Sequence, residues 1–225
     1  GCFQMGSASG DADEQPVHEV CVGDLYVGKY EVTQEQWRSI MEANPSESEG
    51  RKRPVEKVSW YQAASFAELL GKRSKMPYRL PTEAEWEKAA RGGEDRRYPW
   101  GEEQANCQLA AIAGCGESAK PVSSYFTVPS PFGTRNQAGN VWEWTSSRKL
   151  PWDRSRDPER KGAAYGAKML SDGTPRLKSH AKDYFIIKGG SYLDDGRTVR
   201  ASAKQLLPMD FYSPALGIRC AQDVK

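Results

Sequence analysis

Glycine and proline interrupt this chain so often that long regular elements are excluded over most of its length. The 225 residues include 21 glycines and 14 prolines, and hydrophobic residues make up only 38%. Seven tryptophans and ten tyrosines accompany them. A chain of this size is long enough to bury a substantial core. The composition therefore predicts a loop-rich globule that is held together by aromatic packing.

The helix signals all lie in the first part of the chain. Thr33, Ser59 and Thr82 each precede a helical pattern and are predicted N-caps, and Gly71 is predicted to stop the second helix. After residue 95 the pattern changes to short strands separated by long loops. Because neither an internal repeat nor a clean linker is visible, the sequence predicts one α+β domain over residues 1–225.

Residues 148–182 differ from the rest of the chain in charge. They contain ten Lys and Arg residues against four Asp and Glu residues, which predicts a long basic surface excursion. The chain as a whole has a net charge of +2 and a pI of about 8.2, which is too balanced for a general nucleic-acid partner. No apolar run approaches the roughly 20 residues of a membrane span, so no membrane insertion is expected.

The five cysteines predict two local disulfides and one free thiol. Cys2 and Cys21 each lie in a strand-like stretch, and the two stretches are expected to pair. Cys107 and Cys115 close a short Ala/Gly-rich loop, which leaves Cys220 unpaired. Disulfides imply an oxidising compartment, so we expect a periplasmic or secreted protein whose targeting segment has been removed. The alternative is a cytosolic protein with five reduced thiols.

Five motifs follow one another in this chain: RLPTEAEWEKAARGG, YPWG, FGTRNQAGNVWEWTSS, KGGSY and LGIRCA. Together they resemble the formylglycine-generating enzyme family, whose members are also called sulfatase-modifying-factor domains. The resemblance covers nearly the whole chain. It implies a compact C-type-lectin-like fold with little regular secondary structure and long loops. It does not fix an activity, because one fold hosts many functions.

The resemblance also implies a structural calcium site within NQAGNVWEWT. By match to the family, its ligands would be the side chains of Asn136 and Glu143 and the backbone carbonyls of Gly139 and Val141. Calcium takes roughly six to eight oxygen ligands of these kinds. The alternative is that Glu143 is a buried glutamate whose partners are an arginine or backbone N–H groups.

The segment KGGSYLDDGRTVRASAK differs from the family's aerobic enzymes in its chemistry. Those enzymes carry two cysteines after the Gly-Gly-Ser motif, which bind copper(I) and exchange with the substrate cysteine. Here the first cysteine position falls on Asp194, and residues 193–200 contain no cysteine. Cys220 lies in an apolar final strand and is predicted to be a core residue. We therefore expect no copper and no formylglycine generation, and we interpret Asp194 and Asp195 as a solvated turn.

Presence of the scaffold motifs without the copper cysteines predicts a non-catalytic, exported accessory or regulatory protein that binds a partner protein, such as a membrane-protein ectodomain. Relatives of this type include periplasmic proteins that promote signalling through a membrane threonine kinase in type VI secretion. The candidate partner surface consists of Arg148, Lys149, Arg154, Arg156, Tyr192, Asp194, Asp195 and Arg197.

Two other functions stay open from the sequence. The first is an oxidoreductase or maturation enzyme whose site is not recognisable from a motif. The second is a lectin-like scaffold that binds ligands through residues near its C-terminus.

Overall fold

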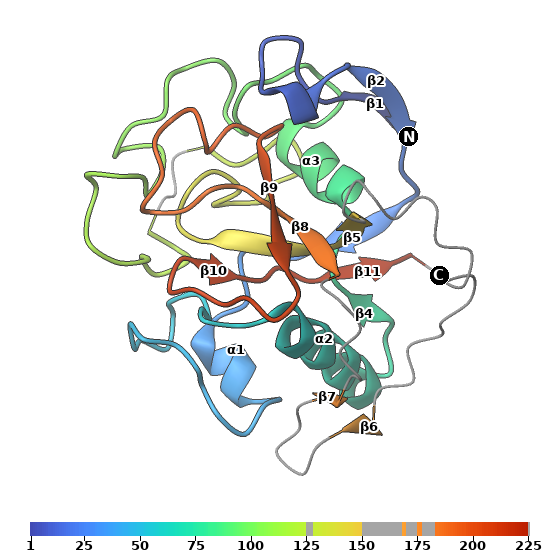
Figure 1. The fold of residues 1–225 in the computed structure, drawn as a ribbon, viewed down its shortest axis with the longest axis vertical. Helices are drawn as coiled ribbons and strands as arrows, with labels where there is room; N and C mark the ends of the chain where they lie inside the picture. Colours follow the sequence, from blue (N-terminus) through green and yellow to red (C-terminus); the bar gives the residue numbers. More distant parts are fainter. Residues whose placement is uncertain (125–127, 150–167, 170–174, 177–182, 225) are drawn as a thin grey trace.

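A computed structural model gives the arrangement of the chain (Figure 1). Most of the predicted basic excursion lies outside the part that it describes, as do Arg154 and Arg156 of the candidate partner surface. The structure describes residues 1–124, 128–149, 168–169, 175–176 and 183–224.

Three α-helices occur among the described residues, and each begins at the predicted N-cap. They are α1 (Gln34–Arg38), α2 (Trp60–Ser74) and α3 (Glu83–Arg91). The side chains of Thr33, Ser59 and Thr82 accept a hydrogen bond from the third backbone N–H of each helix, and the side chain at that position bonds back. These capping boxes stabilise helix starts in a chain that otherwise favours loops.

The predicted end of α2 at Gly71 is wrong. The helix continues to Ser74 and ends at Lys75, which adopts a left-handed conformation with φ of 58°. Gly71 is instead a packing position, because a Cβ there would lie 2.9 Å from the carbonyl oxygen of Met76. Glycine here allows the chain after the helix to fold back against it.

The strands of the described residues are short. They are β1 (Cys2–Met5), β2 (His18–Cys21), β3 (Leu25–Val27), β4 (Tyr78–Arg79), β5 (Trp142–Lys149), β6 (Lys168–Met169), β7 (Pro175–Arg176), β8 (Tyr184–Lys188), β9 (Lys204–Pro208), β10 (Leu216–Gly217) and β11 (Ala221–Asp223). A short 3-10 helix covers Ala12–Glu14. Within the described part of the chain these strands form four small sheets, with the order β10-β5-β8-β9 in the central sheet, β3-β11-β4 in a second sheet, and the pairs β1-β2 and β6-β7.

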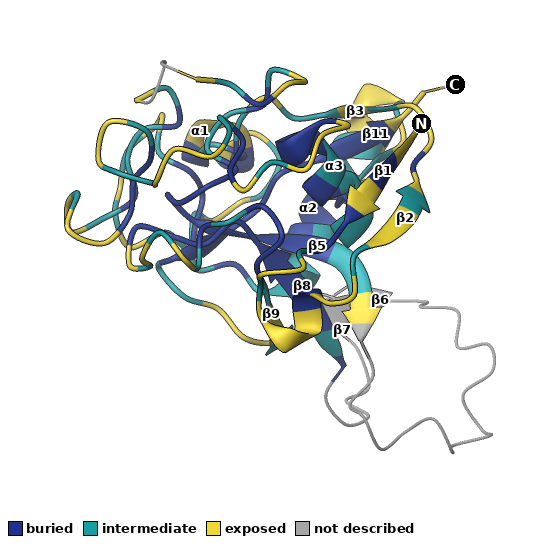
Figure 2. Cartoon of the chain, turned by 90° about the horizontal axis from the view of Figure 1, so that it is seen from above, coloured by how far each residue is buried: buried dark blue, intermediate teal, exposed yellow. Residues whose placement is uncertain are grey.

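The central sheet separates α2 from α3 (Figure 1). On the α2 side the largest core cluster includes Trp144, Phe66 and Phe185. Aromatic stacking connects its parts, with ring centroids 5.0 Å apart for Trp37 and Phe66 and 3.9 Å apart for Trp60 and Phe185. Figure 2 shows the buried residues gathered in α2, β5 and β8, with exposed residues on β2 and β9. Aromatic packing thus forms the core, as the composition predicts.

Both predicted disulfides are present. Cys2 and Cys21 are bonded and lie opposite each other in the β1–β2 hairpin. A second disulfide joins Cys107 and Cys115. Disulfides persist outside reducing compartments, so this pair of bonds indicates a non-cytoplasmic protein. No helix in the described ranges is long and apolar enough to cross a membrane.

Cys220 is the remaining thiol and is buried in the main core cluster, as predicted. Burial raises the pKa of its thiol to about 12, so the reactive thiolate is suppressed at neutral pH.

We expect a thiol reagent to detect one thiol per chain after denaturation without reductant and none in the native protein. A count of five after denaturation would contradict both disulfides.

Candidate functional site

Strand β5 directs Glu143 away from the aromatic core. Its neighbours Trp142 and Trp144 pack in that core, and alternation along a strand places the carboxylate on the opposite face. There Oε2 of Glu143 accepts hydrogen bonds from Nε1 of Trp86 at 2.6 Å and Nε of Arg219 at 2.9 Å. Oε1 accepts from Nη2 of Arg219 at 2.7 Å. The buried carboxylate is therefore paired with an arginine through two hydrogen bonds.

Arg219 also joins two loops to this strand. Its Nη1 donates to the carbonyl of Gly28 and its Nη2 to the carbonyl of Arg135, both at 2.7 Å. The side chain has no exposed surface. Burial opposes its charge, but Glu143 more than compensates and raises the pKa of Arg219. The guanidinium thus acts as a fixed internal cation that holds three segments together.

Glu31 is a second buried acid in the same region. Its carboxylate accepts from Nδ2 of Asn136 at 2.8 Å and from Nδ2 of Asn140 at 2.6 Å. Burial raises the pKa of Glu31 to about 7, with Arg219 opposing the shift and Glu143 adding to it. The site therefore holds two buried carboxyl groups, Glu31 and Glu143, and one buried guanidinium, Arg219. Glu143 is the bidentate partner of this guanidinium.

The structure places two of the predicted calcium ligands, Asn136 and Glu143, in this network. Asn136 and Gly139 both have positive φ angles, of 58° and 83°, so the loop turns sharply before β5. Within the described ranges no group donates a hydrogen bond to Oδ1 of Asn136 or to the carbonyls of Gly139 and Val141. These three oxygens are of the kind that calcium binds, whereas the carboxylate of Glu143 is held by an arginine, as in the alternative interpretation of this residue. Calcium binding stays a prediction.

The turn after the Gly-Gly-Ser motif is built around Asp194. Its Oδ2 accepts from Nε1 of Trp142 at 2.9 Å, from the N–H of Ser191 at 2.9 Å and from the Ser191 hydroxyl at 2.5 Å. Asp194 is therefore a structural anchor for this turn, and it is half-buried. Tyr192 is buried, because it packs with small apolar side chains including Ala215. The assignment of Tyr192 to a partner surface is therefore wrong, whereas that of Asp194 stays a prediction.

Two other residues of this turn do lie at the surface. Asp195 and Arg197 are exposed. Oδ1 of Asp195 accepts from the N–H groups of Arg197 at 2.9 Å and Thr198 at 3.1 Å. The Thr198 N–H holds the pKa of Asp195 below its usual range. Asp195 thus lies in a solvated turn, as the sequence predicts, whereas the carboxylate of Asp194 is bonded within the fold.

The rest of the candidate partner surface begins at the end of β5. Arg148 forms an ion pair with Asp183, which anchors it at the start of β8. Lys149 is the last residue of β5 and lies opposite Tyr184 in the register with β8.

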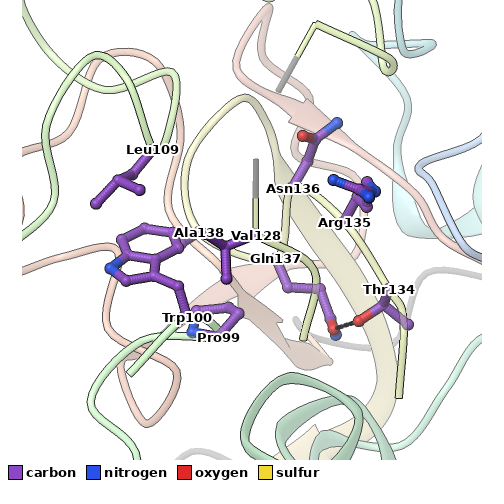
Figure 3. Close-up of a pocket in the computed structure, with 9 residues that line it drawn as sticks. All are labelled: Pro99, Trp100, Leu109, Val128, Thr134, Arg135, Asn136, Gln137 and Ala138. Carbon is purple, nitrogen blue, oxygen red and sulfur yellow. Dashed lines mark hydrogen bonds between the residues drawn. The ribbon is translucent and has the colours of Figure 1, made fainter. Parts of the chain in front are cut away.

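A shallow recess lies beside the buried network (Figure 3). Trp100 and Leu109 lie on one side of it, with Asn136 and Arg135 on the other. The ring of Trp100 stacks on Tyr98 at a centroid distance of 5.0 Å. The residues that line the recess are Pro99, Trp100, Leu109, Val128, Thr134, Arg135, Asn136, Gln137 and Ala138.

The sequence prediction missed Glu31, Asn140, Arg219 and the bond from Trp86. The available signal was the arginine of LGIRCA, a charged residue in an otherwise apolar segment, because such a charge requires a buried partner. Its partner was not identifiable, because it lies 76 positions away in the sequence.

The comparisons with known proteins agree with this architecture. Solved structures with the same fold include Treponema denticola variable protein 1, with a TM-score of 0.78 and 24% identity over 98% of this chain and 91% of that one. PvdO from Pseudomonas aeruginosa matches with a TM-score of 0.77 and 21% identity over 100% and 92%. The fold class is thus α+β and C-type-lectin-like, with few helices, small sheets and long loops.

The family follows from the sequence matches. The sulfatase-modifying factor enzyme 1-like domain matches residues 1–224. This chain therefore belongs to the sulfatase-modifying-factor family, which confirms the resemblance. Over the full length of this chain, it is 30% identical to the serine/threonine-protein kinase pkn1 of Chlamydia caviae, but it spans only 37% of that kinase. It is 32% identical to the formylglycine-generating enzyme of Thermomonospora curvata over 83% of this chain and 61% of the enzyme.

Proposed function

We propose that this chain is a non-catalytic member of its family that acts as an exported accessory or regulatory protein by binding a partner protein. The observation that carries the proposal is the use of Asp194. It stands where the resemblance places a copper-binding cysteine, and its carboxylate holds Trp142 and Ser191. The one free thiol, Cys220, is buried with a pKa raised to about 12. Neither residue supplies the thiolate that disulfide exchange requires.

The partner that we propose is the ectodomain of a membrane protein, in a pathway such as type VI secretion kinase signalling. Two observations support it. The disulfides favour a compartment where such ectodomains lie, and several sequence relatives are named serine/threonine-protein kinases.

Affinity capture from a native envelope fraction tests this proposal. The bait is the full chain, and the matched control carries Glu in place of the ten Lys and Arg residues of 148–182. We expect one membrane protein to be enriched by the wild type and lost with the control, and a purified ectodomain to bind directly. Conversion of a peptide cysteine to formylglycine by the purified chain would contradict the non-catalytic assignment. The absence of any directly binding protein would contradict the partner-binding role.

Structural calcium forms part of the proposal, with three of the four ligands expected from the sequence, because the carboxylate of Glu143 is held by Arg219. If the ion binds Asn136 and the carbonyls of Gly139 and Val141, calcium should raise the melting temperature, because ligands that bind the native state stabilise it by about 2.7 kcal/mol at 100 times Kd. Asn136→Gly keeps the left-handed backbone accessible but removes the amide oxygen, so the calcium response should be lost. An equal response in both proteins, measured by differential scanning calorimetry with magnesium as control, would refute the assignment.

A further inference from the structure

Four loop segments that are far apart in the sequence lie side by side over the buried network. The N–H of Arg135 donates to the carbonyl of Lys29, and the N–H of Val122 donates to the carbonyl of Lys52, both at 2.8 Å. Between these pairs, Nδ2 of Asn136 donates to the carbonyl of Val122 at 2.8 Å. We call this surface the basic face, which comprises residues 28–30, 51–53, 120–123 and 134–137.

The basic face concentrates positive charge. Its four segments contain six cationic residues and no acidic one. Arg51 forms an ion pair with Glu35, and Nη1 of Arg53 donates to Ser118 at 2.9 Å, so these two are engaged locally. Lys29 and Lys52 are exposed. The cationic residues are Lys29, Arg51, Lys52, Arg53, Lys120 and Arg135.

The acids beneath the basic face do not neutralise it. Glu143 is paired with Arg219, and that guanidinium also binds the carbonyls of Gly28 and Arg135 in the basic face. Glu31 is buried, and its carboxylate accepts hydrogen bonds from Asn136 and Asn140, so it is not presented at the surface. The basic face therefore presents a net positive potential that favours an anionic partner.

A small recess with a mixed polar and apolar lining adjoins the basic face and shares Arg135 and Asn136 with it (Figure 3). Its apolar side is formed by Trp100 and Leu109, with Val128 exposed at the margin. Positive charge next to these two apolar side chains is suited to a segment that combines acidic residues with a small apolar side chain.

We propose that the basic face binds an acidic segment of a partner protein, with one apolar side chain of that segment seated against Trp100 and Leu109. This inference rests on the proposed function and specifies the charge and polarity of the partner segment that binds. A protein segment fits better than a lipid surface, because Trp100 and Leu109 line a recess and do not form a protruding apolar tip.

A binding titration tests the inference on the full chain. The probe is a fluorescein-labelled peptide of glutamates with one central leucine, followed by fluorescence anisotropy, and the same peptide with lysines serves as its control. The variant Lys29→Glu/Lys52→Glu reverses two charges of the basic face. The matched control Lys72→Glu/Lys75→Glu makes the same charge change on exposed residues at the end of α2.

We expect the basic-face variant to bind the glutamate peptide at least about tenfold more weakly than wild type, with the α2 variant within about twofold. Added salt should weaken the wild-type complex. Equal loss in both variants, or no binding to the acidic peptide, would overturn the inference. Sedimentation of wild type with phosphatidylglycerol vesicles, reduced in the basic-face variant, would assign the basic face to a membrane instead.

The capture experiment separates this inference from the proposed function. An ectodomain that binds wild type and the basic-face variant equally well would leave the proposed function standing and remove the basic face from it. Failure of every ectodomain to bind, with the acidic peptide still bound, would refute the proposed function alone.

Discussion

Replacing Arg219 by methionine is expected to lower the free energy of unfolding by about 3–5 kcal/mol. The substitution leaves the carboxylate of Glu143 buried with Trp86 as its remaining hydrogen-bond donor, and an uncompensated buried charge is strongly destabilising. It also removes the donors to Gly28 and Arg135. Urea unfolding followed by tryptophan fluorescence, with the disulfides intact, measures this loss.

Two further variants make that measurement specific. Arg38→Met removes an exposed arginine whose ion pair with Glu49 spans 3.6 Å, and it should cost less than about 1 kcal/mol. The double variant Arg219→Met/Glu143→Gln removes both charges and keeps an acceptor for Trp86, so it should recover much of the stability. A single variant within about 1 kcal/mol of wild type would show that the pair does not hold the site together.

The second large effect is expected at Glu87, on the side of α3 that faces β8. Its carboxylate accepts from Nζ of Lys188 at 2.9 Å, Nη1 of Arg91 at 2.7 Å and the N–H of Gly6 at 2.8 Å. Lys188 has no exposed surface and also donates to the carbonyl of Ser202 at 3.0 Å. Glu87→Gln should lower the free energy of unfolding by about 3–5 kcal/mol, because it leaves a buried lysine without its counter-charge.

The pH dependence of this effect has a defined sign. Burial alone would raise the pKa of Glu87, but Lys188 and the Gly6 N–H hold it below its ordinary value of 4.5. A carboxyl group whose pKa is lower in the folded state contributes its full stabilisation above the unfolded value and loses it as the pH falls. The difference between wild type and Glu87→Gln should therefore be largest near neutral pH and shrink in acid.

The control for Glu87 is a glutamate on the surface of α2. Glu68→Gln breaks an exposed i,i+4 pair with Lys72 and should change stability by less than about 0.5 kcal/mol. The double variant Glu87→Gln/Lys188→Met should be more stable than Glu87→Gln, because the lysine charge is removed. If Glu68→Gln and Glu87→Gln cost the same, the buried ion pair is not a stabilising feature of this fold.

Local features of the fold were predictable from the sequence, whereas its buried charges were not. The caps of all three helices and both disulfides follow from residues that lie near each other in the chain or flank matching strands. The end of α2 was mispredicted because glycine is used there for close packing. Conversely, Glu87 and Lys188 are 101 positions apart, and no local pattern connects them.

In the candidate site too, the positions along the chain were predictable from the sequence, whereas the pairing of distant side chains was not. Motif matching placed Asn136, Gly139, Val141 and Glu143 in one loop and strand, and Asp194 in the turn after Gly-Gly-Ser. It did not show that Arg219 pairs with Glu143, or that Tyr192 and Asp194 turn inward. Side-chain direction depends on packing between distant segments, so a surface assigned from sequence alone includes residues that the fold buries.

The second sheet has a consequence for the order in which the chain folds. Its central strand is β11, near the end of the chain, and β11 pairs with β3 and β4 from the first part. β3 therefore gains its partner only after nearly every other residue has been synthesised. Loop closure over such a distance is slow. Vectorial folding from the N-terminus therefore cannot complete this sheet before β11 has been synthesised.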